Sequence, residues 1–122
     1  MKVLVGIGGS ADGFNALDRT IERSQEAADE LTVAVVENPT SSPSPDSVAE
    51  MAERRLADAG VAADVVQLAG HPGSELVAMA ERQQYDQLVL GGGESSPLGK
   101  VSLGQIAEFV VLNATVTVTL IR

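Results

Sequence analysis

The sequence predicts an α/β fold, a single domain over residues 1–122 in which helices cover both faces of a five-stranded parallel sheet. Five short runs rich in Val, Leu and Ile alternate with helix-length segments, as in repeated βα units. The first run, residues 2–7, is almost wholly apolar, which is typical of a strand covered on both faces. Parallel strands need right-handed crossovers, and in the common doubly wound arrangements the first strand is central. The predicted architecture is a three-layer α/β/α sandwich with strand order 3-2-1-4-5.

The elements are predicted from apolar periodicity and from the residues that begin and end helices. Strands are expected at 2–7, 31–36, 61–68, 85–90 and 116–121, and helices at 12–28, 45–59, 74–84 and 103–113. Ser10 or Asp12 is expected to cap the first helix, and Gly60 to end the second. Residues 38–45, rich in Pro, Ser and Thr, are expected to form a flexible loop, and 91–102 a glycine-rich loop.

The loops that follow the first and fourth strands, residues 8–12 and 91–102, are expected to flank one crevice. In doubly wound sheets, ligands bind at the carboxyl ends of the strands, where the strand order reverses. This crevice is therefore the predicted ligand site.

The composition excludes several classes of function. The chain has 17 acidic against 8 basic residues, a formal net charge of −9, which disfavours binding to nucleic acid. It has no cysteine and one histidine, so disulfides, thiolate or histidine-cluster metal sites and cysteine nucleophiles are excluded. Since no signal peptide and no apolar run of membrane-spanning length is present, a cytoplasmic protein without a membrane partner is expected.

The surface is expected to suit a salt-rich cytosol. Only Lys2 and Lys100 are lysines, and the aromatic residues are two Phe and one Tyr. Dense counterions screen the self-repulsion of so acidic a surface.

Four segments together resemble the universal stress protein family. The segment 85–91, Tyr-Asp-Gln-Leu-Val-Leu-Gly, is similar to the family's fourth strand, and Gly70-x-Pro72 is similar to its Gly-x-Pro turn. The segment 103–110 resembles the start of the family's fourth helix, and 3–10 its first strand and Asp-Gly-Ser turn. The resemblance implies a Rossmann-like fold of the adenine nucleotide alpha hydrolase type, a regulatory role and a two-fold dimer.

The resemblance also implies where a nucleotide would bind. Members that bind ATP carry Gly, two residues, Gly, nine residues, Gly, then Ser or Thr, because small residues and free N–H groups cradle phosphates. Gly91 and Gly104 match this pattern, whereas Glu94 and Gln105 depart from it, and Gly8 replaces the family's aspartate. The predicted site is thus a degenerate nucleotide site with no bound cofactor, and ATP or AMP, with or without Mg²⁺, is the alternative. Its residues are Gly8, Ser10, Gly91, Gly92, Gly93, Gly104 and Gln105.

Two other phosphate-binding patterns are weaker. Gly6-x-Gly8-x-x-Ala11, with Glu37 as a ribose acceptor, fits a dinucleotide fingerprint, so a dinucleotide-binding fragment is the second alternative. Gly99-Lys100 lacks the other residues of a Walker loop, and Lys100 is interpreted as a surface lysine.

No catalytic constellation is found, and the protein is predicted not to be an enzyme. His71 has the chemistry of a general base, but beside Pro72 it is interpreted as a turn residue. The serines, including Ser10, are interpreted as caps, because no histidine is placed to activate them.

The last predicted strand is expected to form the dimer interface. Val116, Val118 and Leu120 alternate with threonines, and neither proline nor charge interrupts the run. An edge strand of this kind pairs readily with a second chain. The sequence thus predicts a dimeric, non-catalytic, ligand-sensing domain that binds a small molecule or a protein partner.

Overall fold

Five parallel strands form the sheet of this protein, in a computed structural model that describes residues 1–38, 43–92, 94–95, 101–102 and 104–122. The strands are β1 (Lys2–Ile7), β2 (Glu30–Val36), β3 (Asp64–Leu68), β4 (Gln87–Gly91) and β7 (Thr117–Ile121). Their order is β3-β2-β1-β4-β7, with every neighbouring pair parallel. The predicted fold class and strand order 3-2-1-4-5 are confirmed.

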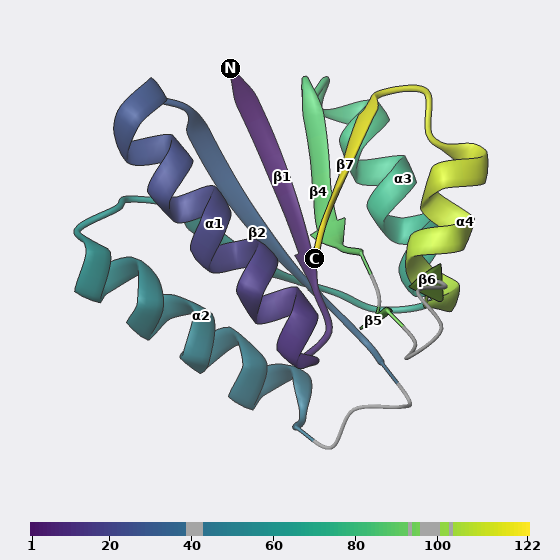
Figure 1. The fold of residues 1–122 in the computed structure, drawn as a ribbon, viewed down its shortest axis with the longest axis horizontal. Helices are drawn as coiled ribbons and strands as arrows, with labels where there is room; N and C mark the ends of the chain where they lie inside the picture. Colours follow the sequence, from purple (N-terminus) through teal and green to yellow (C-terminus); the bar gives the residue numbers. More distant parts are fainter. Residues whose placement is uncertain (39–42, 93, 96–100, 103) are drawn as a thin grey trace.

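Four helices cover the two faces of the sheet (Figure 1). The helices α1 (Ala11–Ala27) and α2 (Pro45–Ala59) lie on one face, and α3 (Pro72–Arg82) and α4 (Gln105–Asn113) lie on the other. Successive side chains of a strand point to opposite faces, so β1 contributes to two separate cores. Val3, Val5 and Ile7 pack beneath α1 and α2, whereas Leu4 packs beneath α3 and α4.

The helix ends follow from local chemistry. Ser10 caps α1, and Gly60 ends α2 in the left-handed conformation with φ 69°, both as predicted. Pro72 occupies the first turn of α3, where its missing N–H costs nothing, so this helix begins before the predicted Ser74.

Two strands begin later than predicted, because helix caps use the residues before them. The N–H of Val61 donates to the carbonyl of Leu56, and that of Tyr85 to the carbonyl of Ala80. Both bonds run back five residues and close the end of a helix, as in a Schellman motif. The predicted strand starts at Val61 and Tyr85 are therefore wrong.

The predicted glycine-rich loop contains a short hairpin. Here β5 (Glu94–Ser95) pairs antiparallel with β6 (Val101–Ser102), and the helix that follows begins at Gln105 rather than at the predicted residue 103. Part of this loop and part of the predicted loop at 38–45 lie outside the described residues.

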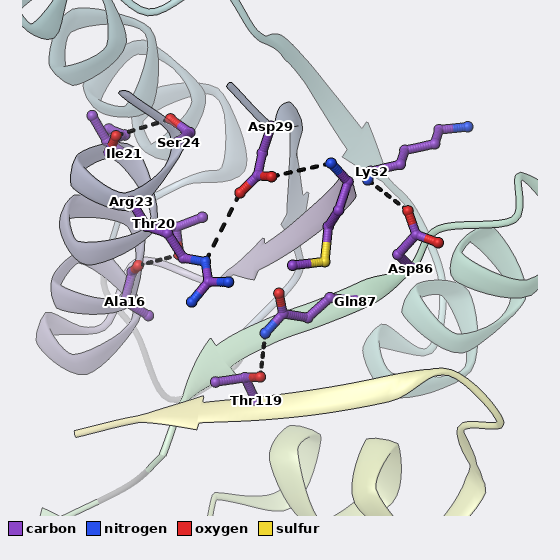
Figure 2. Close-up of polar contacts among 11 residues, drawn as sticks. Lys2, Ala16, Thr20, Ile21, Arg23, Ser24, Asp29, Asp86, Gln87 and Thr119 are labelled. Carbon is purple, nitrogen blue, oxygen red and sulfur yellow. Dashed lines mark hydrogen bonds and ion pairs between the residues drawn. The ribbon is translucent and has the colours of Figure 1, made fainter. Parts of the chain in front are cut away.

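Polar contacts fix the amino ends of the central strands (Figure 2). The backbone N–H of Lys2 donates to the carboxylate of Asp86 at 2.7 Å, and the Asp86 N–H donates to the Lys2 carbonyl at 2.8 Å. Further along β4, the Gln87 amide donates to the Thr119 hydroxyl on β7. Asp86, which opens the fourth-strand signature, thus aligns β1 with β4 and lies away from the ligand site.

Within the described part of the chain, none of the helices is both long and apolar enough to span a membrane.

Candidate functional site

A cavity of about 550 Å³ opens at the carboxyl end of the sheet. Ile7, Val36 and Leu90, from β1, β2 and β4, line its floor. Its size lies within the range of roughly 300–1,000 Å³ typical of small-molecule sites. The predicted crevice between the loops after β1 and β4 corresponds to this cavity.

Three helices begin at the cavity, since the first turns of α1, α3 and α4 all contribute to its lining. The first N–H groups of a helix lack intrahelical partners and carry partial positive charge, so they attract anions. This arrangement supplies an electropositive field from the backbone alone.

Ser10 is the N-cap of α1. Its hydroxyl oxygen accepts from the N–H of Gly13 at 3.3 Å, and its carbonyl accepts from the N–H of Phe14 at 3.1 Å. The structure therefore places Ser10 in the lining of the cavity as a helix cap, as its interpretation from sequence indicated.

Gly8 lines the cavity directly after β1. A Cβ atom built at Gly8 would stand 2.8 Å from Cβ of Asn38, so a larger residue there would displace that side chain. Asn38 also lines the cavity. Asn38 was not predicted as a site residue, although its position two residues after the second strand was a usable signal.

Gly91 lines the cavity, but helix packing explains the glycine. A Cβ atom at this position would lie 2.7 Å from the carbonyl carbon of Asp12 and 2.8 Å from the backbone nitrogen of Gly13. Because both are backbone atoms, no side-chain rotation relieves the contact. Gly91 lets the first turn of α1 approach β4 closely.

Gly92 belongs to the sheet rather than to a phosphate cradle. Its N–H donates to the carbonyl of Ile121 at 2.7 Å, and a Cβ here would stand 2.9 Å from Cγ of Arg122. The predicted contribution of the Gly92 N–H to a nucleotide site is therefore not available in this structure.

Gly104 and Gln105 form the open part of the site. Gly104 is the N-cap of α4 with φ −67°. Among the residues that the structure describes, no side chain caps this helix end and nothing lies within 4 Å of a Cβ built at Gly104. Both residues line the cavity, together with Ile106 and Ala107 of the same first turn. Within the described residues, the backbone N–H groups at the N-terminus of α4 therefore face no competing side-chain cap.

His71 lies at the mouth of the cavity as the N-cap of α3. Its Nδ1 accepts from the N–H of Ser74 at 3.1 Å, and its ring contacts that of Phe109 on α4 edge-on, with centroids 4.8 Å apart. The interpretation of His71 as a turn residue is confirmed, and the structure adds its place beside the ligand site.

The charge of the cavity is unusual for a phosphate site. Among its described lining residues, Asp12 and His71 are the only ones with titratable side chains, and none is Lys or Arg. The described lining therefore offers an anion backbone N–H groups and no Lys or Arg side chain.

A second cavity of about 500 Å³ shares Gly8, Val36, Asn38 and Pro72 with the first. Glu37 lines this second cavity, directly after β2, as the dinucleotide alternative requires. In contrast, a Cβ on Gly6 would lie 2.8 Å from side-chain atoms of Leu76 and Leu90, so core packing accounts for the first glycine of that fingerprint.

Two predicted positions lie outside the described residues, Gly93 of the nucleotide site and Lys100 of the Walker alternative. The backbone of Glu94 pairs with that of Ser102 in the β5–β6 hairpin.

The strand β7 lies at the edge of the sheet and, among the described residues, pairs with β4 alone. Val116, Val118 and Leu120 are partly buried against the core beneath α3 and α4. The predicted interface residues therefore pack inward, and a partner chain would meet the backbone edge of β7 and the exposed threonine Thr117.

Comparisons with known proteins agree with this architecture. A model of the universal stress protein family matches residues 1–122. A comparison with curated proteins gives no match.

Three solved structures illustrate the likeness. A universal stress protein in complex with cAMP is 24% identical with a TM-score of 0.78, over 100% of this chain and 96% of that one. A family protein from Arabidopsis thaliana with AMP bound is 20% identical with a TM-score of 0.71, over 99% of this chain and 90% of the other. A universal stress protein from Archaeoglobus fulgidus in complex with dAMP is 17% identical with a TM-score of 0.73, over 100% and 98%.

Proposed function

The chain belongs to the universal stress protein family, and on that basis we propose that it is a non-catalytic, ligand-sensing domain whose cavity binds an adenine mononucleotide with one phosphate. The ligand is bound reversibly and is not a permanent cofactor. The observation that carries the proposal is the N-terminus of α4, which lines the cavity at Gly104 and Gln105 and which no side chain of the described residues caps.

A single phosphate suits the donors of this site better than a triphosphate. The first turn of α4 offers backbone N–H groups to one anion, whereas the Gly92 N–H is used by the sheet. Without Lys or Arg in its described lining, the site has little to offset three phosphates beside Asp12, because like charges in a partly desolvated place repel. The relatives' ligands, cAMP, AMP and dAMP, support the choice of an adenine monophosphate.

The absence of catalysis is part of the proposal. The hydroxyl of Ser10 accepts a helix N–H, and Nδ1 of His71 accepts another, so both groups serve as caps. Activation of a nucleophile needs a base within hydrogen-bond reach. Among the described residues, no hydrogen bond joins the Ser10 hydroxyl to the His71 imidazole, so these two side chains supply no nucleophile–base pair.

We also propose that the protein forms a cytoplasmic homodimer through the edge of β7. A strand edge without proline or charge presents N–H and C=O groups that pair with a second copy. This part of the proposal is independent of the ligand.

Titration calorimetry in high salt tests the proposed ligand. AMP is expected to bind with a Kd at least about tenfold below that of Mg-ATP, a difference of about 1.4 kcal/mol, and NAD is expected not to bind. Equal or tighter binding of Mg-ATP would show that the site accommodates three phosphates. Tight binding of NAD would favour the dinucleotide alternative instead.

A further inference from the structure

His71 is held in one orientation by two contacts on different helices. Its Nδ1 accepts from the N–H of Ser74 in α3, and its ring packs edge-on against Phe109 in α4 at an interplanar angle of 61°. The hydrogen bond fixes one ring nitrogen, and the aromatic contact limits rotation of the ring. An exposed histidine is thereby ordered at the mouth of the cavity.

The hydrogen bond also decides which nitrogen carries the proton. A neutral imidazole has one N–H and one acceptor nitrogen, and the nitrogen that accepts a hydrogen bond cannot be the one that is protonated. Because Nδ1 accepts, the proton is on Nε2. Among the described residues, Nε2 has no hydrogen-bond partner, so this N–H is left as a donor.

The contact with Phe109 packs the imidazole ring of His71 against α4. Phe109 lies in the second turn of that helix, whose N-terminus lines the same cavity as His71. The imidazole and the first turn of α4 thus border one cavity. In a lining without Lys or Arg among its described residues, such a donor adds directional binding energy.

We propose that His71 contacts the ligand and donates its Nε2–H to a phosphate oxygen of the bound mononucleotide. This inference rests on the proposed function and adds a specific residue to it, outside the glycine pattern of the nucleotide motif. The N-cap bond to Ser74 sets the tautomer that makes the donation possible.

Nitrogen-15 NMR of the imidazole tests the tautomer and the contact together, since the chain has one histidine and hence one set of ring signals. The free protein is expected to show an unprotonated Nδ1 and a protonated Nε2. Saturating AMP is expected to shift the Nε2–H signal, whereas adenosine, which lacks the phosphate, is expected to leave it in place. A proton on Nδ1, or equal shifts with AMP and adenosine, would overturn the inference.

The variant His71→Asn separates the donor from the cap. Asparagine is a good N-cap, so the N–H of Ser74 keeps its acceptor. The melting temperature is expected to fall by only a few degrees, because the edge-on contact with Phe109 is lost while the cap is kept. The affinity for AMP is expected to fall about tenfold, since a hydrogen bond to a charged group is worth about 1.5 kcal/mol or more. The affinity for adenosine is expected to stay the same.

The two proposals fail in different ways. If the unmodified protein binds AMP and His71→Asn binds it equally well, the role of His71 is wrong and the proposed function stands. If the unmodified protein binds neither AMP nor adenosine, both are wrong.

Discussion

The substitution Gly91→Ala separates glycines that pack the fold from those that face the ligand. The new Cβ would lie 2.7 to 2.8 Å from three backbone atoms of Asp12 and Gly13, closer than real Cβ atoms approach anything. Relief requires the first turn of α1 to move away from β4. Overpacking of this kind lowers the unfolding free energy by about 1–3 kcal/mol. Alanine also reduces the conformational entropy of the unfolded chain, which raises the unfolding free energy by about 0.4–1 kcal/mol. We therefore expect a net loss of about 1–2 kcal/mol.

The matched control is Gly104→Ala, the other glycine that fits the family's nucleotide pattern. Its φ of −67° suits any residue and, among the described residues, nothing lies within 4 Å of the new Cβ, so the substitution introduces no overlap. Because alanine is a poorer N-cap than glycine, we expect a loss of about 0.5 kcal/mol, smaller than that of Gly91→Ala. Urea unfolding followed by circular dichroism measures both variants. If Gly91→Ala is as stable as the parent, or if both variants lose the same stability, the assignment of Gly91 to helix packing is wrong.

Three further predictions concern the core, the dimer and the surface charge. Leu76 is fully buried, and Leu76→Ala is expected to lower the unfolding free energy by about 2–5 kcal/mol in urea titrations. Glu81→Ala, at an exposed position of the same helix, is expected to change the unfolding free energy little. Similar values for the two variants would contradict the core assignment. Thr117→Lys places like charges across the proposed β7 pairing, so the mass measured by light scattering is expected to shift from dimer to monomer. Ala57→Lys on α2 is expected to leave the mass of the dimer unchanged. A dimer in both variants would rule out this interface. With a net charge of −9, the melting temperature is expected to rise between low and molar salt, and a flat or falling curve would refute the salt-adaptation hypothesis.

Apolar runs and cap residues were sufficient to predict the fold, but not the exact starts of two strands. Val61 and Tyr85 continue the apolar pattern of the strands that follow them, yet their N–H groups close the preceding helices. The hydrophobic residue after a left-handed helix end is part of the cap. Propensity alone does not distinguish that residue from the first residue of a strand.

The short β5–β6 hairpin escaped prediction for a different reason. Each strand has two residues, so no alternation is long enough to register as a strand pattern. The hairpin depends on backbone pairing of Glu94 with Ser102 and of Ser95 with Val101, which the residue types alone do not predict.

A cavity lies where the sequence predicted the ligand crevice, but the local roles of its residues were only partly predictable. From sequence, Gly91, Gly92 and Gly104 look alike as members of a phosphate-binding pattern. Their roles depend on surroundings that the local sequence does not show. Gly91 lies against the backbone of α1, and the N–H of Gly92 donates to the Ile121 carbonyl. Among the described residues, nothing lies within 4 Å of a Cβ built at Gly104. His71 was predicted as a turn residue, but its contact with Phe109, 38 residues further on, had no local signal.

A crystal structure of the protein with AMP tests the central claim most directly. We predict that the phosphate lies at the N-terminus of α4, within hydrogen-bond distance of backbone N–H groups of its first turn and of Nε2 of His71. A phosphate bound away from the α4 N-terminus, or AMP bound outside the cavity, would contradict the account.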